Sequence, residues 1–182
     1  NDASVAHCVM RMDSMPVRCI AADRTSIYLA EAPLRGSGTA HGGHGGRLTA
    51  RDPRTGKVLR TLNGSGVTLS CVMVANDGHL WSGTFDGLVR VTRRGGQALH
   101  EARAHASGVH CLAEAVEAVF SAGGDFIVRA WSPSLTPLRT LRAHTAAIYA
   151  LCAPIPPAGM PGYHGESFTA GGAGIWSGGD DH

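Results

Sequence analysis

The chain has 182 residues, of which 43% are hydrophobic and 16% charged, with 25 glycines and 9 prolines. This balance excludes a chain that is disordered by composition, and the glycine and proline content disfavours a helical protein. The formal net charge of +2 is too small to indicate a nucleic-acid-binding surface, and no run approaches the roughly 18 apolar residues that a membrane span needs.

Apolar runs typical of short strands open successive segments of the chain. In chain order they are V-R-C-I-A from Val17, T-L-S-C-V-M from Thr68, V-H-C-L-A from Val109 and I-Y-A-L-C from Ile148. Between them, V-R-V-T from Val89 and V-R-A-W from Val128 show the period of two that predicts a half-buried strand. Turns rich in Gly, Pro or Arg separate further candidates, so each segment is expected to hold four short strands.

Several landmarks recur at one fixed step along the chain. Ser82 stands 39 positions before Ser121, and His105 stands 39 positions before His144. The run S-G-T-F-D-G-L-V-R-V-T from Ser82 matches S-A-G-G-D-F-I-V-R-A-W from Ser121, and S-G-G-D-D-H from Ser177 repeats its beginning. A step of about forty residues is the sequence signature of a repeat architecture.

The repeat divides the chain into units of unequal completeness. Residues 1–16 are expected to end a preceding unit, 17–66 to form a degenerate first unit with a Gly/His-rich insertion at 35–46, 67–108 a second unit, 109–147 a third, and 148–182 a truncated fourth with a Pro/Gly-rich insertion at 154–172. Because the sequence begins inside one unit and stops before the third strand of another, it is interpreted as a fragment.

The third unit carries a set of four polar and aromatic residues at defined spacing. A His before the first strand, and S-x-x-x-D-x-x-x-x-x-W across the second and third, resemble a blade of the WD-repeat β-propeller family. His105, Ser121, Asp125 and Trp131 occupy the four positions of that family's hydrogen-bonded tetrad. The resemblance implies that Asp125 accepts hydrogen bonds from backbone N–H groups and from His105, and that Ser121 and Trp131 complete the network. The expected fold is all-β: a WD-repeat-like β-propeller with about four visible blades, partial and not closed within this chain.

Two other units match the tetrad in part. The second has Ser82 and Asp86 in place, but Thr92 stands where a Trp is expected. The fourth supplies His144, Ser177 and Asp181 once its insertion is allowed for. These five residues are therefore interpreted as members of partial tetrads.

Cysteine and tryptophan also recur by repeat. Cys19, Cys71 and Cys111 share one place in successive first strands, which favours small buried residues over disulfide partners or metal ligands. Five cysteines, an odd count without a C-x-x-C pair, indicate a reducing compartment, so a cytoplasmic location is expected. Trp81 and Trp176 share a place just before the serine of the second strand and are expected in the core or between blades.

Neither a metal site nor a nucleic-acid site is expected. His41 and His44, in the Gly/His-rich insertion, have no Cys, Asp or Glu nearby to complete the three or four ligands that zinc usually takes. This insertion is either a solvated loop or a loop that contacts a partner. Arg90 and Arg129 recur at one strand position and are expected to lay their stems along the sheet with their charges in water.

No catalytic motif is present, whether a G-x-S-x-G elbow, a phosphate loop or H-E-x-x-H. A Ser, His and Asp set that repeats from unit to unit is structural, so no catalytic residue and no cofactor are expected. The predicted function is a non-catalytic scaffold whose blades present loops to protein or peptide partners. The alternative is a regulatory or targeting propeller of a larger enzyme. In that view the W-S-G triplets at Trp81 and Trp176 are similar to the propellers that precede some inositol polyphosphate 5-phosphatase domains.

Overall fold

The structure is a computed structural model, and it describes residues 16–32, 46–62, 68–115, 118–142, 144–153 and 175–181. The predictions for residues 1–16, for the insertion at 35–46 with His41 and His44, and for the insertion at 154–172 fall outside the described residues, apart from boundary residues 16 and 46.

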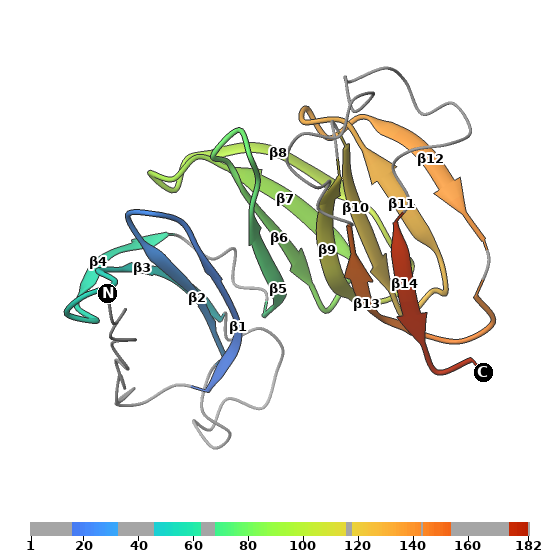
Figure 1. Cartoon of the computed structure of the whole chain (residues 1–182), viewed down its shortest axis with the longest axis horizontal. Coiled ribbons are helices and arrows are strands. Elements are labelled where there is room, and N and C mark those ends of the chain that lie inside the picture. Colours follow the sequence, from blue (N-terminus) through green and yellow to red (C-terminus); the bar gives the residue numbers. More distant parts are fainter. Residues whose placement is uncertain are drawn as a thin grey trace, which may run out of the picture.

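The described chain folds into antiparallel sheets whose neighbouring strands are also neighbours in sequence (Figure 1). Blade 1 contains β1 (Val17–Ala22), β2 (Ile27–Glu31), β3 (Arg47–Arg51) and β4 (Val58–Leu62). Blade 2 contains β5 (Leu69–Val74), β6 (Leu80–Thr84), β7 (Leu88–Thr92) and β8 (Ala98–Arg103). Blade 3 contains β9 (Val109–Ala115), β10 (Ala118–Gly123), β11 (Val128–Trp131) and β12 (Pro137–Leu141). In blade 4, β13 (Ile148–Cys152) pairs with β14 (Trp176–Gly179). The all-β prediction is confirmed.

The turn between β3 and β4 shows how local sequence ends one strand and starts the next. The Asp52 carboxylate accepts hydrogen bonds from the backbone N–H groups of Arg54 at 2.9 Å and Thr55 at 2.7 Å. Gly56 then takes a positive φ of 69°, which a residue without a side chain adopts at little cost. An Asp that caps its own turn and a Gly that completes it fix the reversal of the chain.

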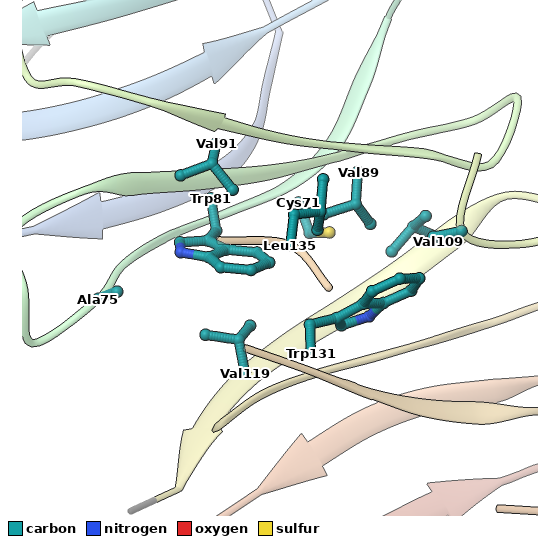
Figure 2. Packing of buried hydrophobic residues seen from close by; sticks show 10 residues of the cluster. Cys71, Ala75, Trp81, Val89, Val91, Val109, Val119, Trp131 and Leu135 are labelled. Atoms are coloured by element: carbon teal, nitrogen blue, oxygen red, sulfur yellow. The ribbon is translucent and has the colours of Figure 1, made fainter. Parts of the chain in front are cut away.

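Successive blades pack through their first two strands. β1 contacts β5, β5 contacts β9, and β9 contacts β13, so the first strands follow one another through the stack. Figure 2 shows Trp81 and Val91 of blade 2 facing Val119 and Trp131 of blade 3 across the largest cluster of buried apolar side chains. Each such large side chain stabilises the fold by about 1.5–3 kcal/mol when fully buried. The core therefore lies between the blades.

One position of the first strand links blade 2 to blade 3 and blade 3 to blade 4 by a hydrogen bond. Ser70, the second residue of β5, donates its hydroxyl proton to the carbonyl oxygen of Val109 in β9. His110, the second residue of β9, lies with Nδ1 3.0 Å from the carbonyl oxygen of Ile148 in β13. The His110 ring also stacks on Tyr149, with ring centroids 4.9 Å apart. These contacts fix the spacing of the first strands.

The two tryptophans at one repeat position have different surroundings. Trp81 is fully buried against blade 3, as expected, and Phe120 at the same position of blade 3 is buried against blade 4. Trp176 is 72% exposed, which contradicts the expectation of core or inter-blade packing for this residue. The physical reason is that Trp81 and Phe120 are covered by the following blade, whereas no described blade packs against blade 4 on the side of Trp176.

Candidate functional site: the tetrad turns

Four side chains of blade 3 form one continuous hydrogen-bonded chain. Trp131 Nε1 donates to Ser121 Oγ at 2.8 Å, and Ser121 Oγ lies 2.8 Å from His105 Nε2. His105 Nδ1 lies 2.7 Å from Asp125 Oδ1, while the backbone N–H of Ala106 donates to Asp125 Oδ2 at 3.2 Å. The network ties the third strand of the blade to the loop that precedes its first strand.

The hydrogen bonds of the network indicate which ring nitrogen of His105 carries a proton. Because the ionised Asp125 carboxylate can only accept, His105 Nδ1 carries the proton that bonds to it, and Nε2 of the neutral ring accepts from the Ser121 hydroxyl. Burial lowers the pKa of His105 more than the hydrogen bond to Asp125 raises it, so the neutral ring is favoured. Burial acts to raise the pKa of Asp125, but its bonds to His105, and then to Arg129, outweigh burial and hold the pKa below the ordinary value.

This arrangement is built for stability and leaves no reactive group open to a substrate. Ser121 is fully buried, His105 is 1% exposed, and both side chains are already fully engaged in hydrogen bonds within the blade, so neither is available as a nucleophile or a base. Every polar atom along the chain has its partner inside the blade. The chemistry that this set performs is therefore internal hydrogen bonding.

Arg129 is a fifth member of the network that the sequence did not reveal. Its Nη1 atom donates to Asp125 Oδ2 at 2.9 Å, and its side chain is 21% exposed. Arg90, at the same position of blade 2, pairs with Glu101. The expectation that both charges lie in water was wrong, because each guanidinium has a carboxylate within reach on its own blade.

Blade 4 contains a more open copy of the same network. His144 Nδ1 lies 2.6 Å from Asp181 Oδ1, and His144 Nε2 lies 2.7 Å from Ser177 Oγ. The backbone N–H of Thr145 donates to Asp181 Oδ2 at 2.7 Å. The hydrogen bonds from His144 and Thr145 lower the pKa of Asp181. The structure thus brings together the three residues singled out in the fourth unit.

Blade 2 replaces the tetrad with a threonine-centred turn. Ser82 is buried in β6, and Asp86 lies in the turn between β6 and β7. The buried Thr84 hydroxyl donates to the Asp86 carboxylate and accepts from the backbone N–H of Leu88 at 2.9 Å. Thr84 was missed because the tetrad pattern has no hydroxyl at this place. One residue thus ties Asp86 to the following strand.

Blade 1 has a buried glutamate paired with two arginines, which sequence reasoning also missed. Glu31 is 2% exposed, and its carboxylate bonds to Arg47 at 2.5 Å and to Arg51 at 2.8 Å. Two guanidinium partners compensate for taking one carboxylate out of water. The signal in the sequence was a Glu at the end of one strand and two Arg that bracket the next.

The Asp-containing turns of blades 2 and 3 and the loop between these blades form one face, which we call the tetrad-turn face, made of residues 84–88, 104–108 and 123–127. The backbone N–H of Ala104 donates to Gly87 O at 2.9 Å, and that of Gly124 donates to Gly108 O at 3.0 Å. Phe85 and Phe126 stand on this face, 49% and 42% exposed. Two half-exposed aromatic rings on hydrogen-bonded turns make an apolar surface on a rigid support.

The described residues give no sign of a metal site or a membrane span. No group of three or more His, Cys, Asp or Glu side chains among them is arranged to hold a metal ion. No helix in this part of the chain is long and apolar enough to cross a bilayer.

Comparisons with known proteins show which solved structures have a similar fold. No family model matches the sequence, and no curated protein matches it. The crystal structure of the computationally designed Ika4 protein is 21% identical, with a TM-score of 0.64 over 79% of this chain and 83% of that chain. The WD40 repeats of RRP9 and the structure of U3-55K are each 20% identical, with a TM-score of 0.65 over 78% of this chain. This chain spans 43% of each of these two proteins, which is less than half their length.

Proposed function

Because the chain has the fold of a WD-repeat β-propeller, we propose that it is a non-catalytic scaffold that binds protein partners through its tetrad-turn face. The support is the geometry of blade 3, where a network of buried hydrogen bonds holds a turn that carries an exposed aromatic ring. Exposed aromatic side chains on rigid supports are the anchors that protein interfaces use most.

The proposal depends mainly on the backbone conformation and the exposure of Phe126. It has a φ of 68°, in the left-handed region that bulky side chains rarely adopt. Gly87 holds the same place in blade 2, one residue after the turn Asp, with a φ of 90°. A large apolar residue that is both strained and 42% exposed contributes little to folding, and such residues concentrate at binding sites.

A second aromatic residue extends the surface toward blade 2. Phe85 is 49% exposed, and the Arg18 guanidinium carbon lies 5.5 Å from the centre of its ring. An Arg held over an aromatic face supplies a cation beside an apolar patch. We therefore propose a partner that offers apolar side chains to Phe85 and Phe126.

The test is the substitution Phe126→Gly in the full chain, compared with Leu59→Ala on β4. Leu59 is also exposed, at 52%, but lies on the outermost strand of blade 1. We expect Phe126→Gly to leave the free energy of unfolding within about 1 kcal/mol of the parent, because relief of strain offsets the greater freedom of Gly.

The readout is quantitative mass spectrometry of proteins captured from cell extract by the parent and both variants. At least one partner should be depleted with Phe126→Gly and retained with Leu59→Ala. Equal capture by all three proteins would contradict the proposed surface.

The free cysteines are consistent with a protein that resides in a reducing compartment. Among the described residues, Cys19, Cys71, Cys111 and Cys152 are free, and burial raises the pKa of Cys71 to about 12. A thiol held protonated in the core is inert and needs no disulfide partner. We propose a cytoplasmic location on this basis.

The alternative, a targeting propeller of a larger enzyme such as a phosphoinositide phosphatase, has no specific observation in its favour. It rests on the W-S-G triplets, yet Trp81 is a core residue and Trp176 is exposed. Because the two W-S-G triplets lie in different environments, they do not support a function shared with phosphatase propellers.

A further inference from the structure

A pocket of about 560 Å³ lies between blades 2 and 3, at the end of the strands opposite the tetrad turns. Its walls come from the turn between β5 and β6, the end of β9, the start of β10, the turn between β11 and β12, and β12 itself. Val119, Pro133 and Leu138 make much of it apolar. We call it the inter-blade pocket.

The buried indole of Trp81 has an unused hydrogen-bond donor at this pocket. Trp81 is fully buried and lines the pocket, but its Nε1 has no hydrogen-bond partner among the described residues. Figure 2 shows this nitrogen on the side of the ring that faces Ala75, another pocket residue, and turned away from Trp131. Trp131 by contrast donates to Ser121. A buried indole N–H usually has an acceptor, so the geometry favours a ligand that supplies one.

The pocket also has an acidic wall without a described Lys or Arg against it. The Glu114 carboxylate accepts the backbone N–H of Asn76 at 2.7 Å, and Asp77 follows in the same turn. Asp77 contacts His79 at 2.8 Å. Burial raises the pKa of Glu114, and the nearby charge of Asp77 raises it further. A positive charge placed here would stabilise both carboxylates.

We propose that the inter-blade pocket binds an extended peptide segment of a partner protein, with an apolar side chain in the pocket and a neighbouring Lys or Arg beside Glu114 and Asp77. The backbone carbonyl of the peptide accepts the Trp81 N–H. An extended peptide offers these three groups within two residues, because successive side chains point to opposite sides and the carbonyl lies between them. The inference rests on the proposed scaffold function and assigns it a second contact.

The test follows the indole N–H signals of the ¹⁵N-labelled full chain by NMR while a blocked peptide is added. The probes are acetyl-Leu-Arg-Leu-amide and acetyl-Leu-Glu-Leu-amide, which differ in the sign of one charge. The substitution Trp81→Phe assigns the Trp81 signal. We expect the Arg peptide to shift that signal and leave the Trp131 signal in place, and the Glu peptide to bind about fivefold more weakly or not at all.

Two variants test the walls of the pocket. Leu138→Ser removes an apolar wall residue that is 52% exposed, and Leu141→Ser, on the same strand but outside the pocket, is its control. Glu114→Gln keeps an acceptor for Asn76 and removes the charge. Both pocket variants should weaken the Arg peptide about fivefold, and the control should not. The proposal is overturned if the Trp81 signal does not move, if both peptides bind equally, or if Leu138→Ser behaves like Leu141→Ser.

The capture experiment separates this inference from the scaffold function. A partner that depends on Phe126 but is indifferent to Leu138→Ser and to excess Arg peptide would overturn the inter-blade pocket and leave the scaffold intact. A Trp81 signal that moves with the Arg peptide, in a chain that captures no partner, would uphold peptide binding by the pocket and contradict the tetrad-turn face as a partner surface.

Discussion

The Asp125 carboxylate accepts hydrogen bonds from four donors in and next to blade 3. The donors are the His105 ring, the Arg129 guanidinium and two backbone N–H groups, those of Ala106 and Ile127. The carboxylate therefore joins the loop before β9 to the turn after β10. Because His105 is buried, its Nδ1–H has no water to turn to if the carboxylate is lost.

We expect Asp125→Ala to lower the free energy of unfolding by about 2 kcal/mol or more, since it strands the buried donor of His105. The measurement is a urea denaturation curve of the full chain. Asp181→Ala is the matched control: its carboxylate holds the same place in blade 4 but is 18% exposed, against 8% for Asp125, so its loss should be smaller. An unchanged curve for Asp125→Ala would remove the tetrad as a source of stability.

The sequence could indicate the four tetrad positions because each has a fixed spacing from a strand end. It could not indicate Arg129, whose contribution depends on a long side chain folding back four residues to Asp125. Nor could it indicate the unpaired N–H of Trp81. Whether an indole finds an acceptor depends on how neighbouring blades pack, and spacing along one chain has no information on that.

At the scale of elements, the turn between β6 and β7 shows a glycine that close packing requires. Gly87 has a φ of 90°, and a Cβ added there would come within 2.2 Å of the carbonyl oxygen of His105. That carbonyl approaches because the N–H groups of Ala104 and His105 both donate to Gly87 O. The glycine thus allows blade 2 and the loop before blade 3 to touch along the backbone.

Gly87→Ala should therefore destabilise the chain by about 1–3 kcal/mol, from strain at a positive φ and from collision with backbone that has no room to move. Gly95→Ala is the control, because a Cβ at Gly95 meets nothing within 4 Å. Thermal denaturation followed by circular dichroism compares them. Equal melting temperatures for the two variants would show that the turn can open without cost.

The strands themselves were the most predictable elements. Their alternating residues and their turns are local properties, so β7 and β11 lie where the period of two predicted them. Burial was less predictable. β10 is buried along its whole length on both faces, and β12 is exposed throughout, although both contain apolar residues. Which strand is central and which is outermost follows from the order of the sheet rather than from its composition.

At the scale of the whole molecule, the exposed indole of Trp176 is the largest departure from the repeat. Trp81 and Phe120 at its position are each buried against the following blade. Trp176 presents 72% of its surface to solvent on a strand whose outer edge has no described partner. An open strand edge beside an exposed aromatic ring is a surface on which other chains pair.

We expect the 182-residue chain to self-associate through this edge, and Trp176→Gln to shift it toward monomer. Sedimentation velocity over a range of concentrations measures the shift. Leu59→Gln, which removes an exposed apolar residue from β4 of blade 1, should leave the association unchanged. A parent chain that sediments as a monomer at every concentration would contradict this expectation.

The hydrogen bonds from Ser70 and His110 to the next blade fix one of the two spacings that determine how such blades would close into a ring. They hold the first strands at a fixed spacing, whereas the bulk of Trp81 or Phe120 one strand further out sets how far neighbouring blades diverge. The difference between these two spacings, relative to the distance between the two strands, sets the wedge angle of a blade. Since the wedge angles of a closed propeller must add to a full turn, a bulkier residue at the Trp81 position favours fewer blades and a smaller one favours more. The size of one side chain per repeat is therefore one of the factors that set how many blades a closed ring of such blades would hold.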